Sequence, residues 1–128
     1  MKEIHEILVI DDEPSVADAL MLILEDRGYR VVVAKTGREA IEHSERKEFC
    51  LTITDFRLPD MTGFDVLHAI RRRNPQHQAI LITSHSTPEV FAEARDIGAI
   101  TVLPKPFLPS EILQLITDAL AACQSLRR

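Results

Sequence analysis

The sequence predicts an α/β domain with a parallel five-stranded sheet covered by helices on both faces. Five short apolar runs, rich in β-branched residues and without two-residue alternation, recur along the chain. Such runs are typical of strands that are buried on both faces. Segments with helical spacing of apolar residues lie between them, and this alternation with short connections favours right-handed crossovers and a parallel sheet.

The predicted strands are short, and residues at the ends of the intervening segments mark the helices. The strands span Ile7–Ile10, Val31–Ala34, Phe49–Thr54, Ala79–Thr83 and Ile100–Leu103. The first helix begins near Pro14 and ends before Gly28, and the second follows Thr36, which with Glu39 has the form of a capping box. The other three begin after Thr62-Gly63, after Thr87-Pro88 (ending at Gly98) and after Pro109-Ser110. We interpret Phe91 and Val102 as core residues.

Length and composition bound the function. A chain of 128 residues with 45% apolar composition predicts one domain over 1–128, with a core over about residues 5–122. The polar start "MKEIHE" and the lack of a long apolar run predict a cytoplasmic protein with no membrane partner. A net charge of −5 argues against direct nucleic-acid binding, and we interpret Arg71–Arg73 as a solvated helix end. Cys50 and Cys123 show no metal-site spacing and predict two unpaired thiols.

Polar residues stand at the carboxyl ends of the predicted strands, where open parallel sheets bind their ligands. Carboxylates that share one site repel each other unless a cation offsets them, and an oxygen-only site suits Mg²⁺, or Mn²⁺ in its place. A lysine and a hydroxyl beside such a metal are suited to a phosphoryl group. The strand-end residues are Asp11 and Asp12 (first strand), Asp55 (third), Thr83 and Ser84 (fourth) and Lys105 (after the fifth).

Asp55 is the candidate nucleophile, because it stands alone at a central strand end and a carboxylate can form an aspartyl-phosphate. Asp11 and Asp12 are then left to hold the metal. Each residue alone has a simpler interpretation, as a helix cap, a turn residue, a strand end or a surface lysine. Those interpretations do not explain why three acids, a hydroxyl and a lysine are all predicted at one edge of the sheet.

Four motifs in order, "VIDDEP", "ITDFRLPDMTGFDVL", "LITSHS" and "VLPKPF", resemble the receiver domain of bacterial two-component response regulators over nearly the whole chain. The resemblance implies the flavodoxin-like fold with strand order 2-1-3-4-5. It matches Asp55 to the phosphoacceptor, and Asp11 and Asp12 to the acidic pair that binds Mg²⁺ together with Asp55. The backbone carbonyl of Arg57 matches a further metal ligand.

The same resemblance matches Thr83 to the switch hydroxyl and Lys105 to the lysine that contacts the phosphoryl group. The Lys105-Pro106 bond falls where the family has a cis peptide. His85 falls near the mouth of the site, where it could affect access of water, although a single loop histidine more often has no role. Val102 is a departure, because the family usually has Tyr or Phe there and a valine cannot report phosphorylation by rotation of a ring.

The leading interpretation is a signalling switch and not an enzyme. A phosphorylated histidine on a sensor histidine kinase or phosphotransfer protein donates to Asp55, and the domain assists its own phosphotransfer and dephosphorylation. The modified domain then changes its affinity for a downstream protein, for a fused output domain or for itself, the last through the final two helices. The sequence leaves open whether the domain works alone or belongs to a longer regulator.

Three alternatives come from other functional classes. A degenerate receiver that acts only as an interaction module is favoured by Val102 and disfavoured by the complete acidic set. A phosphohydrolase that works through an aspartyl-phosphate usually carries a D-x-D pattern after its first strand, whereas the acids here are adjacent. A flavin or nucleotide carrier would need a Gly-rich or Ser/Thr-rich phosphate loop after the first strand, and none is present.

Overall fold

The computed structural model describes residues 5–98 and 100–126, with side chains up to residue 121. Five strands and five helices alternate along this part of the chain. The elements are β1 (Glu6–Ile10), α1 (Pro14–Asp26), β2 (Arg30–Ala34), α2 (Gly37–Arg46), β3 (Leu51–Asp55), α3 (Gly63–Arg73), β4 (Gln78–Thr83), α4 (Pro88–Ile97), β5 (Ile100–Pro104) and α5 (Pro109–Leu126). All four strand pairings are parallel and the order is β2-β1-β3-β4-β5, which confirms the predicted class and strand order.

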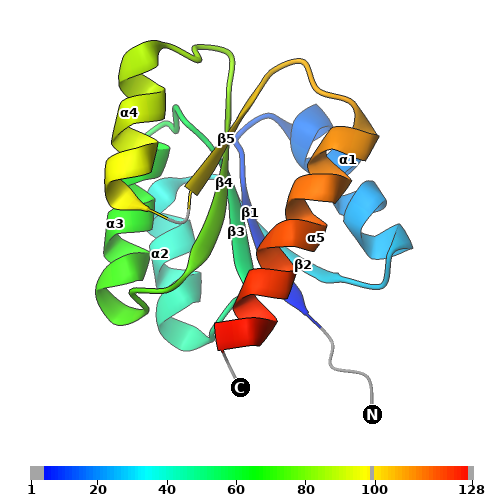
Figure 1. Ribbon diagram of the computed structural model, residues 1–128. Coiled ribbons are helices and arrows are strands. Elements are labelled where there is room, and N and C mark those ends of the chain that lie inside the picture. The colour runs from blue at the N-terminus through cyan, green and yellow to red at the C-terminus, as the bar shows by residue number, and fades with distance from the viewer. Residues whose placement is uncertain (1–4, 99, 127–128) are drawn as a thin grey trace.

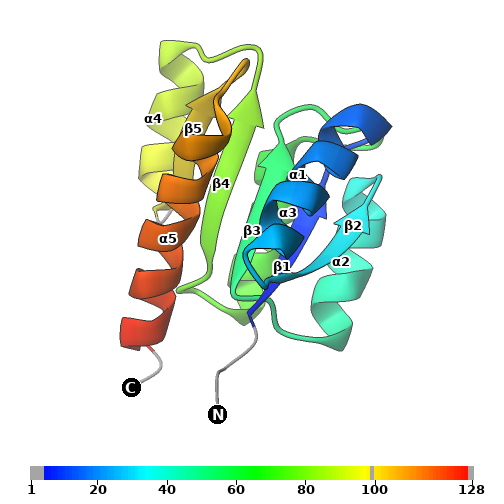
Figure 2. The same ribbon diagram turned by 90° about the vertical axis from the view of Figure 1, so that its right-hand side faces the viewer.

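Helices cover both faces of the sheet. Helices α2, α3 and α4 lie on one face, and α1 and α5 lie on the other (Figure 1). Figure 2 views the molecule from the side of α1 and α5, with β1 beginning and α5 ending at the lower edge. The carboxyl ends of the strands therefore meet at the upper edge, where the loops that follow β1, β3, β4 and β5 come together.

Successive residues of β1 pack against opposite helix layers. Ile7 and Val9 belong to a cluster with apolar residues of α1 and α5, whereas Leu8 and Ile10 belong to a cluster with residues of α2 and α3. All four side chains are fully buried. Because burial of one such side chain stabilises a fold by roughly 1.5–3 kcal/mol, both layers hold the strand in place.

The helix ends follow the sequence signals, with one correction. Thr36 caps α2 by accepting the Glu39 N–H, but the Glu39 carboxylate accepts the N–H of Lys35 and not that of Thr36, so the predicted capping box is only half formed. A complete capping box joins Thr62 and Asp65 at the start of α3.

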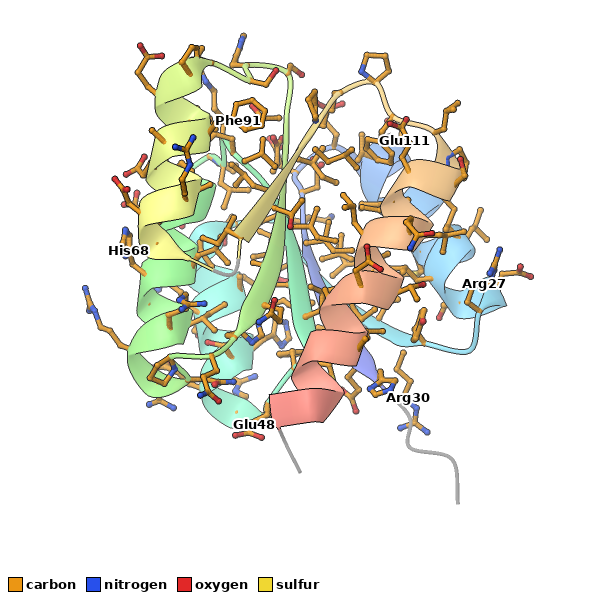
Figure 3. All side chains as sticks on the ribbon, in the orientation of Figure 1. Arg27, Arg30, Glu48, His68, Phe91 and Glu111 are labelled. Carbon is orange, nitrogen blue, oxygen red and sulfur yellow. The ribbon has the colours of Figure 1, made fainter. Side chains whose placement is uncertain are left out.

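Two further predictions about single residues need correction. Strand β3 begins at Leu51 and not at Phe49. Phe49 belongs to the preceding loop, and its side chain is buried in the cluster that α2 and α3 form with the sheet. Phe91 is 40% exposed and is not a core residue, since α4 buries Val90 and Ala94 and Phe91 lies about 100° around the helix from Val90 (Figure 3).

Cys50 is buried, and its Sγ lies 3.3 Å from His5 Nδ1. The Cys123 side chain lies outside the described side chains. Within the described part of the chain, no helix is both long and apolar enough to span a bilayer.

Candidate phosphoryl-transfer site

Three carboxylates meet at the carboxyl edge of the sheet. Asp11 and Asp12 directly follow β1, and Asp55 ends the neighbouring parallel strand β3. One oxygen of each carboxylate lies within 4.8 Å of the other two. Asp11 is buried and Asp55 half-buried, whereas Asp12 is exposed, so the cluster opens to solvent on the side of Asp12.

Asp11 is the most deeply placed of the three acids. Its backbone N–H donates to Ala34 O at 3.1 Å, and its Oδ1 accepts the N–H of Glu13 at 2.9 Å. Burial raises the pKa of Asp11, and the bond from Glu13 and the charge of Lys105 oppose that rise. Glu13, and neither aspartate, occupies the cap position of α1. A helix-capping role therefore does not account for the pair.

Lys105 lies beside the carboxylates. Its Nζ is 3.5 Å from Asp55 Oδ2 and 3.7 Å from Asp11 Oδ2, and the side chain is only 17% exposed. The Lys105 N–H donates to Thr83 O at 2.8 Å, which holds the Lys105 backbone at this edge. The Lys105-Pro106 bond is cis. One ammonium thus faces two carboxylates, which leaves a net negative charge.

This donor set fits a hard divalent cation. The three carboxylates offer only oxygen ligands, which Mg²⁺ prefers, and their proximity to each other is unfavourable without an additional positive charge. Mg²⁺ usually takes one or two carboxylates and keeps waters or phosphate oxygens on its other positions. The exposure of Asp12 leaves one side of the cluster open for them.

The last residue of β4 and the two residues that follow it lie at the same edge. Thr83 is buried, and its hydroxyl oxygen accepts the N–H of His85 at 2.9 Å, which folds the loop back on the strand end. Ser84 and His85 are exposed. Ser84 also lines a groove of about 510 Å³ with Lys105, Pro106 and residues of α1, so this groove opens beside the lysine.

Val102 packs in the apolar layer of α3 and α4. It is half-buried on β5 and packs against the cluster of Phe64, Leu81, Val90 and Ala94 under α3 and α4. Phe56, directly after Asp55, packs against the same cluster and meets Phe64 edge to face at 5.5 Å between ring centroids. This cluster thus contains an aromatic ring at position 56, directly after Asp55 in the sequence, and a valine at position 102.

The loop after β3 carries Arg57 and a residue that our sequence reasoning overlooked. Arg57 is exposed and pairs with Thr62 in an isolated antiparallel bridge. Asp60, at the tip of the loop, accepts the N–H groups of Gly37 and Arg38 at the start of α2, and these bonds lower its pKa. Gly37 at the first position of α2 indicates that another group could approach this helix start closely. The sequence alone does not show which distant acid binds there.

The family model for the response regulator receiver domain matches residues 7–117. The chain belongs to this family. A response regulator receiver protein of Anaeromyxobacter sp. is 37% identical over 108 residues, which are 84% of this chain and 45% of that protein. The transcriptional regulatory protein ZraR of Escherichia coli K12 is 33% identical over 121 residues, which are 94% of this chain and 27% of ZraR.

Solved receiver structures match nearly the whole fold. Chemotaxis protein CheY4 of Vibrio cholerae superposes with a TM-score of 0.86 at 31% identity, covering 92% of this chain and 100% of that one. A receiver domain from Methanospirillum hungatei gives a TM-score of 0.91 at 29% identity, covering 96% and 98%. This receiver domain is thus a signalling domain of two-component systems, and it spans less than half of the curated relatives described above.

Proposed function

We propose that this receiver domain is a phosphoacceptor switch in which Asp55 takes a phosphoryl group from a phosphohistidine. The donor is a sensor histidine kinase or a phosphotransfer protein, and the reaction depends on Mg²⁺. The observation that supports this most directly is the cluster of Asp11, Asp12 and Asp55 with Lys105 at 3.5 and 3.7 Å from two of them. A partly exposed nucleophile, an oxygen-only donor set and a fixed ammonium are the parts that phosphoryl transfer to a carboxylate needs.

In the proposed transfer, an Asp55 carboxylate oxygen attacks the phosphorus of the donor. The new P–O bond forms as the P–N bond breaks, and the departing imidazole nitrogen keeps the electron pair and takes up a proton from solvent. The Lys105 ammonium lies where it can offset charge on the phosphoryl oxygens and on Asp55. Hydrolysis reverses the modification, since attack of water on phosphorus restores the carboxylate and releases phosphate.

Asp11, Asp12, Asp55 and the Arg57 carbonyl would hold Mg²⁺, or Mn²⁺ in its place, and the ion would supply the positive charge that the cluster lacks. Thr83 is proposed as the hydroxyl that binds a phosphoryl oxygen. The hydroxyl can donate to a phosphoryl oxygen while it accepts the His85 N–H, so a movement of Thr83 toward the phosphoryl group would move the loop that follows β4 with it. Ser84 and His85 lie at the exposed mouth, where they would affect access of water to the acyl phosphate.

The output is a change in protein binding. A phosphoryl group changes affinity only by favouring one of two pre-existing conformations. The candidate recipients are a downstream protein, a fused output domain and a second copy of this chain joined through α4 and α5. Because a valine stands at position 102 in place of the usual aromatic residue, another side chain would have to change conformation on phosphorylation. Phe56, which directly follows Asp55 and packs in the same cluster as Val102, is the candidate.

Incubation with Mg²⁺ and acetyl phosphate, followed by intact-mass measurement, tests the chemistry. We expect one phosphoryl adduct on the wild-type chain, and none on Asp55→Asn or after addition of a chelator. Sizing of the modified protein then tests dimerisation. A folded wild-type protein that takes no adduct with Mg²⁺ present would contradict the proposal and favour the phosphorylation-independent interaction module that Val102 suggests.

A further inference from the structure

The start of α2 is held by a side chain from the loop after β3. The first N–H groups of a helix have no partner within it. Asp60 Oδ1 accepts the Gly37 N–H at 2.8 Å and Oδ2 accepts the Arg38 N–H at 2.9 Å, so each oxygen of the carboxylate binds one of these groups. Thr36 Oγ1 accepts the next one, from Glu39. Hydrogen bonds from N–H groups to a carboxylate are stronger than neutral ones, and Asp60 therefore links two distant segments firmly.

A second contact at the same place keeps the loop close to the helix. A Cβ atom added to Gly37 would clash with Met61 Cγ and would lie 2.5 Å from Met61 Sδ. The Met61 side chain therefore occupies the space beside the Gly37 backbone, which only glycine leaves open. Asp60 and Met61 together fix the tip of the loop against α2, which packs beside α3 on the same face of the sheet (Figure 1).

The loop is closed on itself between its tip and Asp55. Leu58 N–H donates to Met61 O at 3.0 Å, Arg57 pairs with Thr62, and Gly63 N–H donates to Phe56 O at 2.7 Å. Because these bonds join the two sides of the loop, a displacement of the tip carries to Arg57 and to the segment that directly follows Asp55. The bonds from Asp60 to α2 are thus connected to the Arg57 backbone through the hydrogen bonds within the loop.

We propose that Asp60 is a positioning residue for the receiver site: by binding the start of α2 it holds the loop after β3 so that the Arg57 carbonyl is preorganised toward the acidic cluster. This inference rests on the proposed Mg²⁺ site. Residues that orient metal ligands without touching the metal change metal affinity when they are removed, typically by tenfold or more. Asp60 is three residues from Arg57 and is not itself in the acidic cluster.

Asp60→Ala tests the inference, with Thr36→Ala as the matched control. Both substitutions remove side-chain oxygens that accept N–H groups at the start of α2, two at Asp60 and one at Thr36, but only Asp60 joins the helix to the loop. We expect Asp60→Ala to weaken Mg²⁺ binding roughly tenfold in an amide-shift titration by NMR, and Thr36→Ala to leave it within about twofold of wild type. Asp60→Asn, which keeps one acceptor oxygen, should lie between them.

A readout on the metal-free protein separates positioning from general stability. We expect Asp60→Ala to speed hydrogen exchange at the Leu58 and Gly63 amides, and Thr36→Ala to leave both exchange rates unchanged. This difference should hold even if the two substitutions lower the melting temperature by the same amount. Equal Mg²⁺ affinities for wild type and Asp60→Ala, or equal affinity losses in the two variants, would overturn the inference. A wild-type chain without Mg²⁺-dependent shifts would overturn this inference and the proposed function together.

Discussion

A single buried histidine makes the fold sensitive to acid. His77 is buried before β4, and its Nε2 lies 2.7 Å from Thr52 Oγ1. Burial, followed by the charge of Arg71, lowers the pKa of His77 from 6.5 to about 4. Between these two pH values the unfolded chain binds a proton at His77 and the folded chain does not. The free energy of unfolding therefore decreases as the pH falls from 6.5 to about 4. We expect this loss to reach about 3 kcal/mol, measured by urea unfolding across that range.

The substitution His77→Gln removes the titrating group and keeps a side chain that can bond to Thr52. The wild-type stability should fall more steeply with acid than that of the variant, although the variant is less stable at pH 7. His68→Gln is the control, since His68 is an exposed residue on α3 (Figure 3). Parallel stability curves for wild type and His77→Gln would show that His77 takes up a proton as readily in the folded chain as in the unfolded chain, and would contradict the prediction.

The sequence was sufficient to place some of these residues and not others. Asp11, Asp55 and Lys105 each follow an apolar run, and a parallel sheet necessarily brings such positions to one edge. Asp60 and His77 could not be placed in this way. The partner of Asp60 is a helix start 23 residues away, and the contact of His77 with Thr52 depends on the pairing of β3 with β4.

At the scale of elements, α3 begins in close contact with the end of β3, beside the proposed phosphoacceptor Asp55. A Cβ atom at Gly63 would lie 2.5 Å from the Asp55 backbone oxygen and 2.9 Å from Leu81 Cδ1. The helix can therefore begin here only without a side chain. We expect Gly63→Ala to cost about 1–3 kcal/mol in urea unfolding, the usual cost of overpacking, and to lower the initial rate of phosphorylation by acetyl phosphate.

Gly28→Ala is the matched control for that substitution. Gly28 has φ +86°, so alanine is strained there by roughly 1–2 kcal/mol, but an added Cβ would meet no atom of the described chain within 4 Å. Gly28 follows α1 at the edge opposite the acids, and its variant should keep the wild-type rate. If both variants phosphorylate equally fast, the contact of Gly63 with β3 does not position Asp55.

Helix signals at the ends of elements were more informative than apolar residues within them. Pro14, Thr62 and Thr87 each mark a helix start correctly, because their backbone and hydrogen-bonding chemistry is local. The apolar character of Phe49 and Phe91 was misleading, since a large side chain can be buried from a loop or can remain partly exposed on a helix. That outcome depends on neighbouring elements that the local pattern does not contain.

For the whole molecule, the fold gathers like charges at one edge, and a cation bound there should therefore stabilise all of it. A ligand that binds only the folded state adds about 2.7 kcal/mol at a concentration of 100 times its Kd. We expect the melting temperature of the wild-type chain to rise with the logarithm of Mg²⁺ concentration and to return to its starting value when a chelator is added. Thermal unfolding followed by circular dichroism measures both.

Asp11→Asn decides whether this effect comes from the acidic cluster. Asparagine keeps an oxygen that can accept the Glu13 N–H and removes one of three crowded negative charges. The variant should melt higher than wild type without metal, because less repulsion is present, and its melting temperature should respond little to Mg²⁺. If Mg²⁺ raised the melting temperatures of variant and wild type equally, the ion would be acting on the general surface charge. The stabilisation would then not come from a cation bound at the acidic cluster.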